Sequence, residues 1–386
     1  MDSAANEFMQ GLDTQEWSSC KNILVIRADN LGDLLMSSPA IRALKQTFGA
    51  KITVLTSLMA TGIAKLIREI DEVITYDLPW IKTNNAIASS SFFEVVEKVR
   101  EMNFDAAVIF TVFSQNPLPA AMLTYLANVP RRLAYCRENP YDLLTEWVPD
   151  KEPYDLVRHQ VHRDLDLIKT VGASVTDDRL SLTIPEGAYL AAERKLSKQG
   201  VDVRKPWIIF HAGVSEPKRQ FPKKIWIEAG KKMIDQGYQA LFTGTKNESV
   251  LTEELAIGIG EQAYSVAGLF SLEEFVAVIK HAPLVISVNT GTVHIAAATG
   301  TPIVVLYAAT NPQHTPWKVP CKILQFEVQE QMRSKNEVIQ FLYKDVYKEA
   351  IPMPTSDDIV EACFELLKTP KTPDLAATST SVPITD

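Results

Sequence analysis

The sequence predicts an α/β protein made of two doubly wound domains, each with a parallel sheet. Two continuous apolar runs, 22–27 (NILVIR) and 207–210 (WIIF), are typical of strands buried on both faces. Each run begins a series of strand and helix patterns that alternate along the chain, as in doubly wound sheets. The length of 386 residues also exceeds what one compact core usually holds.

The first series starts with the strand at 22–27 and continues with a helical pattern over 33–48. Its apolar residues recur at Leu35, Ile41, Leu44 and Phe48, on one side of a helix. The same patterns predict further strands at 51–56, 73–76 and 106–110, and helices at 92–102 and 159–171.

The second series repeats the arrangement after the strand at 207–210. Ser271 followed by Glu274 forms the pattern of a capping box at the start of one helix. The predicted helices are 224–236, 250–259, 271–281, 294–299 and 356–367. The predicted strands are 239–243, 263–266, 284–288 and 302–307.

These patterns suggest a domain plan with loose ends. We expect a flexible tail over 1–20, a first domain over 21–190 and a second over 191–350. A C-terminal helix within 351–368 follows, and the Thr/Pro/Ser-rich segment 369–386 has the composition of a disordered tail.

Composition limits the classes of function. The net charge of -8 argues against a general nucleic-acid binder, which usually carries a basic excess. The four cysteines lie far apart, without metal-ligand spacing, as expected of free thiols in a reducing compartment. No apolar run reaches the ~18 residues of a membrane span, and the N-terminus lacks a signal-peptide pattern, so we expect a cytoplasmic protein.

The first candidate loop runs from Arg27 to Asp33, after the first strand (RADNLGD). It has no GxGxxG pattern, which disfavours a dinucleotide-dependent oxidoreductase. We expect Gly32 to allow an unusual turn, and Asp29 and Asp33 to lie beside a helix N-terminus. Asp33 is then either a helix cap or a general base that removes a proton from an acceptor hydroxyl.

The second candidate loop, 211–222, follows the first strand of the second domain. It combines small residues, the hydroxyl of Ser215 and the adjacent cations Lys218 and Arg219. Backbone N–H groups and cations of this kind suit a diphosphate. The alternative is a solvated surface loop with incidental charges.

The third candidate loop, 287–294, leads from a strand directly into a helix. Thr290, Gly291 and Thr292 place hydroxyls and backbone N–H groups at a helix N-terminus, which is a common anion site. We expect His294 to begin the helix, where it either donates to a phosphate or braces the loop. Glu248, after another strand of this domain, is a ligand for ribose hydroxyls or a capping carboxylate.

Together these loops resemble glycosyltransferase family 9, the ADP-heptose:lipopolysaccharide heptosyltransferases. The resemblance spans about 22–318. It rests on the R-x-D-x-x-G-D motif with the following SPAIRAL, the HxG segment from His211 to Trp226, the segment NTGTVHIAAATGTP from Asn289 to Pro302, and the helix HRDLDLI at 162–168. The resemblance implies a GT-B fold, with two facing Rossmann-like domains that bind acceptor on the first and donor nucleotide on the second.

The resemblance also implies roles for individual residues. Asp33 corresponds to the catalytic base, within an acceptor-side loop that includes Arg27, Asp29 and Gly32. Lys218 or Arg219 corresponds to a phosphate-binding lysine, and both stay candidates. Thr290, Gly291 and His294 correspond to the diphosphate loop and Glu248 to the ribose ligand. Asn289 stands where the family commonly has an aspartate linked to the donor sugar.

The expected function is therefore inverting, metal-independent transfer of a sugar, a heptose by resemblance, from a donor such as ADP-heptose to a lipopolysaccharide core or another glycan. No cofactor is expected. Asp164-Leu-Asp166 lies in a helical pattern and is expected to be a helix face rather than a metal site. The first domain also carries basic residues that could meet an anionic acceptor: Arg131, Arg132, Arg137, Arg158 and Arg163.

Other functions stay open at this point. A non-transferring nucleotide-sugar enzyme, such as an epimerase, would consume the donor without an acceptor. A nucleotide-sugar-binding protein would bind the donor without reaction. Peripheral contact with the inner face of a membrane also stays open.

Overall fold

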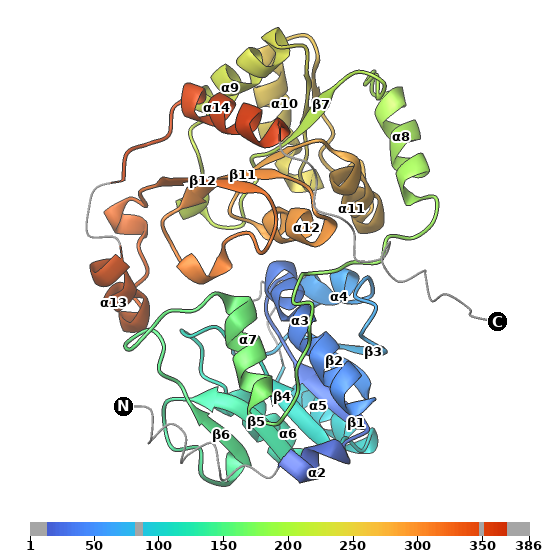
Figure 1. Cartoon of the computed structure of the whole chain (residues 1–386), viewed down its shortest axis with the longest axis vertical. Helices are drawn as coiled ribbons and strands as arrows, with labels where there is room; N and C mark the ends of the chain where they lie inside the picture. Colours follow the sequence, from blue (N-terminus) through green and yellow to red (C-terminus); the bar gives the residue numbers. More distant parts are fainter. Residues whose placement is uncertain (1–13, 82–87, 347–350, 369–386) are drawn as a thin grey trace, which may run out of the picture. The chain divides into compact units, whose positions relative to one another are not determined.

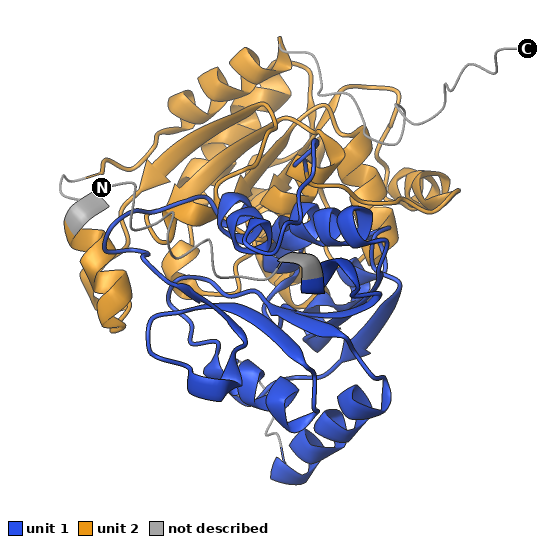
Figure 2. Ribbon diagram, turned by 60° about the horizontal axis from the view of Figure 1, so that its bottom comes forward, with its two compact units in different colours: residues 1–179 blue, residues 180–386 orange. Residues whose placement is uncertain are grey.

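The chain divides into two compact units. The computed structural model describes residues 14–81, 88–346 and 351–368. Contacts within the chain separate Met1–Arg179 from Leu180–Asp386, so the division comes before the boundary expected at residue 190 (Figure 2). The tail expected over 369–386 and the first part of the N-terminal tail lie outside the described residues.

Unit 1 is built on a parallel sheet with the strand order β3-β2-β1-β4-β5-β6 (Figure 1). This is the order of the doubly wound dinucleotide-binding fold. The strands are β1 (Asn22–Ile26), β2 (Lys51–Thr56), β3 (Glu72–Thr75), β4 (Ala106–Ile109), β5 (Arg131–Cys136) and β6 (Glu146–Pro149). β1 is central and pairs in parallel with β2 on one side and β4 on the other.

Helices cover both faces of this sheet. Apolar residues of α5 (Ser89–Glu101) and α6 (Leu118–Leu126) share one core cluster with β1 and β4. On the other face, α3 packs against α4 and α7. These three helices are α3 (Leu31–Phe48), α4 (Leu58–Ala64) and α7 (Gln160–Lys169).

Helix α3 contains a proline but stays continuous. Pro39 has no N–H to donate to the carbonyl of Leu35, one turn earlier. The hydroxyl of Ser38 donates to this carbonyl instead, at 2.7 Å. Gly49, with φ of 58°, then ends the helix in the left-handed conformation and turns the chain into β2.

Unit 2 repeats the topology. Its parallel sheet has the order β12-β11-β10-β7-β8-β9, with β7 between β8 and β10. Numbered from β7, this is the same strand order as in unit 1. The strands are β7 (Trp207–His211), β8 (Gln239–Phe242), β9 (Ala263–Ser265), β10 (Val285–Val288), β11 (Ile303–Ala308) and β12 (Cys321–Phe326). The predicted fold class is confirmed.

The helices of unit 2 also lie on both faces of the sheet. The central core cluster joins β7, β10 and β11 to α9 (Lys223–Asp235), α10 (Ser249–Ile259) and α14 (Ser356–Leu367). On the other face, α11 (Leu272–His281) packs against α8 (Ala188–Lys198) and α12 (Gly291–Thr299). The last helix, α14, is thus an integral part of unit 2. Helix α13 (Glu337–Val346) completes the set described here.

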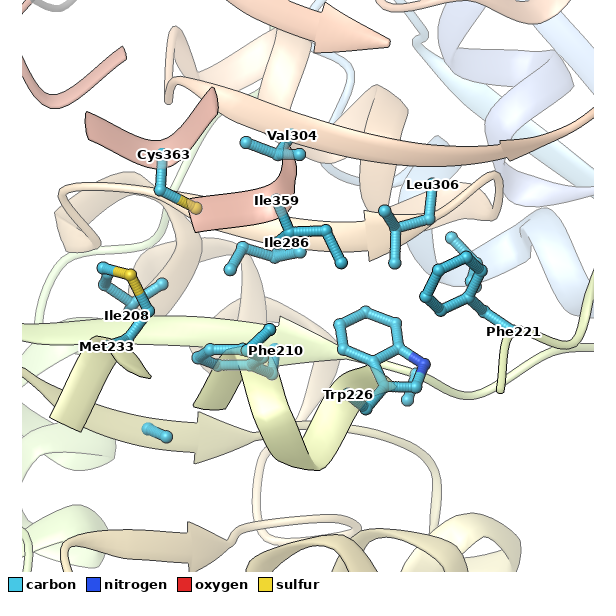
Figure 3. Packing of buried hydrophobic residues seen from close by; sticks show 14 of the residues in the cluster. Ile208, Phe210, Phe221, Trp226, Met233, Ile286, Val304, Leu306, Ile359 and Cys363 are labelled. Atoms are coloured by element: carbon cyan, nitrogen blue, oxygen red, sulfur yellow. The ribbon is translucent and has the colours of Figure 1, made fainter. Parts of the chain in front are cut away.

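One loop of unit 2 is anchored in this core by Phe221. Its ring lies among the core residues in Figure 3 and contacts the rings of Trp226 and Phe326, with centroids 5.9 and 5.3 Å away. Only 2% of Phe221 is exposed. The anchor fixes the loop that runs from β7 to α9, which carries Lys218 and Arg219.

The expected flexible tail is wrong for its last residues. Thr14–Ser18 form the short helix α2, and Trp17 is buried. The indole of Trp17 packs near the ring of Phe48, and its Nε1–H donates to Glu146 at 3.0 Å. An indole covers a large apolar area, and its N–H finds a partner in β6, so this segment is held against unit 1.

Several elements have no counterpart in the prediction. β5 and β6 start with charged residues, and β12 starts with Cys-Lys and is partly exposed, so they lack the continuous apolar run of a central strand. Helices α4, α6, α8 and α13 were likewise not predicted. The strand and helix bounds that were predicted agree with the structure within a few residues.

We predict that Phe221→Ala destabilises unit 2 by about 3 kcal/mol or more, because it leaves a cavity among packed aromatic rings. Chemical denaturation followed by circular dichroism measures the change. Phe93→Ala, at a position that is 62% exposed, is the control and should cost about 1 kcal/mol or less. Equal effects of the two changes would contradict the anchoring role of Phe221.

Candidate active site

In doubly wound sheets, ligands bind beyond the carboxyl ends of the strands, where the strand order reverses. In unit 1 this point lies between β1 and β4, and in unit 2 between β7 and β10. The candidate loops predicted from the sequence follow β1, β7 and β10. Each unit therefore has a candidate site at its own reversal point.

In unit 1, the site is organised by the buried guanidinium of Arg27. Its Nε lies 3.3 Å from Asp29 Oδ2, and one terminal nitrogen lies 3.3 Å from Asp33 Oδ1. Burial alone would lower the pKa of Arg27, but nearby carboxylates, Asp29 first among them, raise it above its ordinary value. Arg27 is thus a fully charged bridge between two carboxylates.

Asp33 lies in the first turn of α3 rather than at its cap. The helix begins at Leu31 with Asn30 as N-cap, and Asp33 Oδ2 accepts the backbone N–H of Asn30 at 3.2 Å. The Asp33 carboxylate belongs to a capping box and is also paired with Arg27. A role in capping the helix is therefore compatible with a role as general base. Gly32 was expected to make an unusual turn, but it lies within the helix and outside the positive-φ glycines.

Asp29 lies deeper than Asp33 and accepts a hydrogen bond from Gln115 Nε2 at 2.5 Å. Burial raises the pKa of Asp29 to about 6, although Arg27 acts in the opposite direction. The nearby charge of Asp33 adds to the increase. The pKa of Asp29 therefore lies well above the ordinary range of an aspartate.

Helix α7 supplies a second polar layer behind these residues. Asp164 is buried and accepts hydrogen bonds from Ser37 and Gln160, at 2.6 and 2.7 Å. Asp166 pairs instead with Arg158 at 2.8 Å, and 45% of its side chain is exposed. Asp164 is thus buried and bonded to polar side chains, whereas Asp166 is partly exposed and paired with Arg158.

The basic residues expected to meet an acceptor are mostly bound internally. Arg163 is fully buried and pairs with Asp150 and Glu152 at 2.8 and 2.6 Å. Arg132 is buried and donates to a series of backbone carbonyls. The expectation of an acceptor-facing patch is therefore wrong for Arg163 and Arg132, because their guanidinium groups bind partners inside the protein. The other three also pair with acidic residues.

A cavity of about 230 Å³ opens at the reversal point of unit 1. It is bordered by residues at the ends of β1 and β4, by the start of α6 and by the segment after β3. Its polar lining includes Asp29, Gln115 and Asn116, and its aromatic lining includes Trp80. Gln115 and Trp80 were not predicted as site residues, because neither lies in a recognisable motif.

In unit 2, Arg219 joins the two predicted phosphate loops. It donates to the backbone carbonyl of Asn289 at 3.1 Å, so the loop after β7 meets the loop after β10. Lys218 pairs with Glu216 at 3.0 Å, whereas Arg219 lies 3.7 Å from the same carboxylate. Arg219 Nε is buried and has no hydrogen-bond partner among the described residues.

Helix α12 presents its N-terminus beside this junction. It begins at Gly291 with Thr290 as N-cap, so His294 lies in the first turn instead of starting the helix as expected. Thr290 Oγ1 is buried without a hydrogen-bond partner in the described structure, and Thr292 is also buried. The His294 ring meets that of His314 edge-on, at 6.4 Å between centroids.

The side chain of Asn289 faces the end of β11. Its Oδ1 accepts the backbone N–H of Ala308 at 3.2 Å, and its Nδ2 lies 3.2 Å from the hydroxyl of Thr310. The amide therefore uses both of its ends to hold the loop after β11 beside the loop after β10. An aspartate could accept the N–H, but it could not donate as Nδ2 does.

His211 is the last residue of β7, and Glu248 lies in the short 3-10 helix after β8. Glu248 Oε2 accepts from the backbone and hydroxyl of Thr245 in a capping box, at 2.6 and 2.9 Å. Its Oε1 faces Gly213 so closely that any Cβ there would collide with it. Burial lowers the pKa of His211 to about 4, against the opposing charge of Glu248, so its ring is neutral near pH 7.

Ser215, the remaining predicted phosphate residue, is exposed. Thr243 was not predicted, yet it shares a hydrogen bond of 3.0 Å with His211 Nδ1. Thr310 and His314 were also missed. All three follow the carboxyl ends of β8 and β11, which is the signal that could have located them.

The described residues were searched for metal-binding groups and for membrane-spanning helices. No group of three or more His, Cys, Asp or Glu residues there has a metal-binding arrangement. None of the helices in that part of the chain combines the length and hydropathy that crossing a bilayer requires.

Comparison with known proteins agrees with this architecture. Lipopolysaccharide heptosyltransferase 2 of Escherichia coli K12 is 27% identical over 310 residues, which cover 76% of this chain and 84% of the relative. The structure of E. coli ADP-heptose lps heptosyltransferase II superposes with a TM-score of 0.68 at 22% identity, over 90% of this chain and 98% of that chain. The structure of E. coli heptosyltransferase WaaC with ADP gives a TM-score of 0.64 at 19% identity, over 89% and 99% of the two chains.

The two solved structures confirm the GT-B fold class, with two Rossmann-like units. The family match covers residues 92–343, which include 92–179 of unit 1 and most of the described part of unit 2. This chain is a glycosyltransferase that belongs to glycosyltransferase family 9 (heptosyltransferase).

Proposed function

We propose that this chain transfers a heptose from ADP-heptose to a lipopolysaccharide core or a related glycan, with inversion at the anomeric carbon and without a metal ion. The observation that carries the proposal is the pair of orphaned polar atoms at the start of α12. Arg219 Nε and Thr290 Oγ1 are both buried and lack partners in the described structure. Buried polar groups are costly unless protein, water or a ligand satisfies them, so these two atoms are available to a bound ligand.

A diphosphate fits the chemistry of these groups. Arg219 brings a positive charge and N–H donors, and the helix N-terminus adds backbone N–H groups and a partial positive charge. Thr290 and Thr292 add hydroxyls beside the same helix end. We assign Arg219 as the main phosphate ligand, since Lys218 is closer to Glu216 and Arg219 alone reaches the Asn289 carbonyl.

The remaining donor residues have secondary roles in this proposal. Asn289 positions the donor loop through its contacts to β11, instead of contacting the sugar as the resemblance implied. Glu248 offers its Oε1 to the ribose hydroxyls, while its Oε2 holds the capping box. Two E. coli structures support the choice of ADP-heptose as donor. One is of ADP-heptose lps heptosyltransferase II, and the other is of heptosyltransferase WaaC with ADP.

Asp33 is the proposed general base of unit 1. Its carboxylate accepts from Asn30 and pairs with Arg27, so its position is fixed from two sides. Of the Asp33 side chain, 12% is exposed, which leaves a route to an acceptor. A held, partly accessible carboxylate is suited to accept a proton in the transition state.

The reaction then balances in one displacement. Asp33 takes the proton of an acceptor hydroxyl, and that oxygen forms a bond to C1 of the donor sugar. The bond between C1 and the phosphate oxygen breaks, and its electron pair leaves with ADP. Arg219 and the α12 N-terminus stabilise the charge that develops on the leaving diphosphate. Attack from the side opposite the diphosphate inverts the configuration at C1.

The acceptor would be met in the cytoplasm, with peripheral contact at the inner face of the membrane if it is lipid-linked. The two alternative functions differ in their use of the donor. An epimerase-like enzyme would change the sugar of ADP-heptose without an acceptor, and a binding protein would leave it intact.

We predict that the chain, given ADP-heptose and a heptose-deficient lipopolysaccharide core, releases ADP and forms a glycoside of opposite anomeric configuration. Mass spectrometry and NMR of the product measure transfer and configuration. A parallel reaction without acceptor, and a donor panel with GDP- and UDP-sugars, serve as controls. Retention of configuration, or donor turnover that does not depend on an acceptor, would contradict the proposal.

We predict that Asp33→Asn lowers kcat of transfer by about 10²–10⁴-fold, since this is the usual contribution of a general base. ADP affinity should not change, because Asp33 belongs to unit 1. Asp77→Asn is the matched control, because Asp77 also binds a helix N-terminus, at Leu58 N, in the same unit. If Asp33→Asn keeps full transfer activity, the base assignment fails.

We predict that Arg219→Met weakens ADP binding by about 10–100-fold, which corresponds to the loss of charged hydrogen bonds worth ~1.5–3 kcal/mol. Lys218→Met should cost about threefold or less, because Lys218 is already paired with Glu216 at 3.0 Å. Isothermal calorimetry with ADP measures both changes. Lys224→Met, at a position where 88% of the side chain is exposed, is the control. A larger loss for Lys218→Met than for Arg219→Met would reverse the assignment.

A further inference from the structure

The cavity of unit 1 is chemically distinct from the diphosphate site of unit 2. It lies at the ends of β1 and β4, and Asp29 is part of its wall. Arg27 joins Asp29 to Asp33 through ion pairs of 3.3 Å on each side. The cavity is therefore coupled to the proposed base by a single guanidinium.

The polar groups of this wall have fixed orientations. Gln115 Oε1 accepts the backbone N–H of Val112 at 3.1 Å, so its Nε2 is turned toward Asp29. Asn116 Oδ1 accepts the N–H of Leu118 at 2.8 Å, which leaves the amide N–H groups of Asn116 as donors. Asp29 is an acceptor when ionised. The wall thus offers both donors and acceptors to a ligand, in set positions.

An apolar surface faces the same space. Trp80 is partly buried, and its ring meets that of Phe92 edge-on at 5.9 Å, which stabilises its position. Ile81 lies beside it in the cavity wall. An aromatic platform with a few oriented polar groups is suited to a sugar, which has apolar C–H faces and hydroxyls around its edge.

The size and charge of the cavity limit the class of ligand that it can bind. Its volume of about 230 Å³ is below the ~300 Å³ at which drug-sized sites begin, which suits a single ring. Arg27 is shared between Asp29 and Asp33, so the three groups keep a net negative charge when both carboxylates are ionised. The carboxylate of Asp29 in the wall would therefore repel a phosphate or carboxylate of a ligand, because like charges at close range are unfavourable. A hydroxyl of a neutral sugar can instead donate to it.

We propose that this cavity binds one uncharged sugar ring of the acceptor, held by Trp80 and by hydrogen bonds to Asp29, Gln115 and Asn116. The inference rests on the proposed function, and it names the class of acceptor ring that lies next to Asp33. An anionic ring, phosphorylated or acidic, is excluded from this position by Asp29.

The test uses pairs of probes that differ in one charge. Methyl glycosides of glucose, galactose and mannose are each compared with the uronic acid that carries a carboxylate at C6. Ligand-observed NMR titrations on the full chain, saturated with ADP, measure the dissociation constants. We expect at least one neutral glycoside to bind about 10-fold or more tightly than its uronic acid.

Two variants locate this binding in the cavity. Asp29→Asn should bring the ratio of the two dissociation constants close to one, because it removes the repelling charge. Trp80→Ala should weaken both members of a pair by a similar factor, because the platform does not distinguish charge. Trp80→Ala alters only a partly buried side chain. It therefore still tests the proposal if Asp29→Asn disturbs the pairing of Arg27. Asp142→Asn removes an exposed carboxylate of unit 1 outside the cavity wall and is the matched control.

The pH gives a second readout from the same protein. Asp29 has a raised pKa of about 6, set by burial and by its neighbours Arg27, Asp33, Gln115 and Asp164. Below that pH it loses its charge, while a uronic acid, with an ordinary carboxyl pKa near ~4, stays ionised at pH 5. The preference for the neutral probe should therefore weaken from pH 7 to pH 5, and Asp29→Asn should show no such change.

Several results would overturn the inference: no binding of any neutral glycoside, equal or tighter binding of the uronic acids, or binding that Trp80→Ala leaves unchanged. Failure of the proposed function gives a different result. In that case ADP binding and transfer are absent, whereas the sugar preference of the cavity in unit 1 persists without ADP.

Discussion

Both candidate sites depend on one constraint of parallel sheets. The first strand of each unit sits in the middle, and later strands are added on one side and then on the other. The loops that leave neighbouring strands at this reversal turn away from each other, so the sheet cannot close its own carboxyl edge there. In unit 1 the resulting space is the cavity beside Asp29, and in unit 2 the side chain of Arg219 crosses from one loop to the Asn289 carbonyl of the other. The chemistry of each unit follows from the residues placed at this edge.

The two units use arginine in opposite ways: Arg27 is buried, whereas 26% of the Arg219 side chain is exposed. Arg27 has two carboxylates at 3.3 Å, so its charge is compensated within the protein. Arg219 has a longer carboxylate contact of 3.7 Å and donates to the backbone carbonyl of Asn289. Removing a charge from water is costly unless it is paired, and this cost decides what each arginine can do. Arg27 can hold other groups in place, whereas Arg219 is better satisfied when an anion arrives.

The central strands could be predicted because they are buried on both faces, and a run such as NILVI leaves few alternatives. Edge strands such as β6, with one polar side, carry no comparable signal. The sequence motifs also located Asp33, Arg219 and Thr290 within the loops that follow strands. They could not separate Lys218 from Arg219, because that depends on a contact between residues 70 positions apart. Nor could they reveal that the Asn289 amide is directed to β11, since its partners Ala308 and Thr310 belong to no motif.

The sharing of Arg27 between two carboxylates also has an evolutionary consequence. Replacing Arg27 would leave the carboxylates of Asp29 and Asp33 without the charge that they share, and such a loss is strongly destabilising. Replacing either aspartate alone leaves Arg27 paired with the other one. Lineages can therefore exchange Arg27 only after the carboxylates have changed, or after a permissive change that opens the region to water. Of the three residues, Arg27 is the last that a lineage can lose.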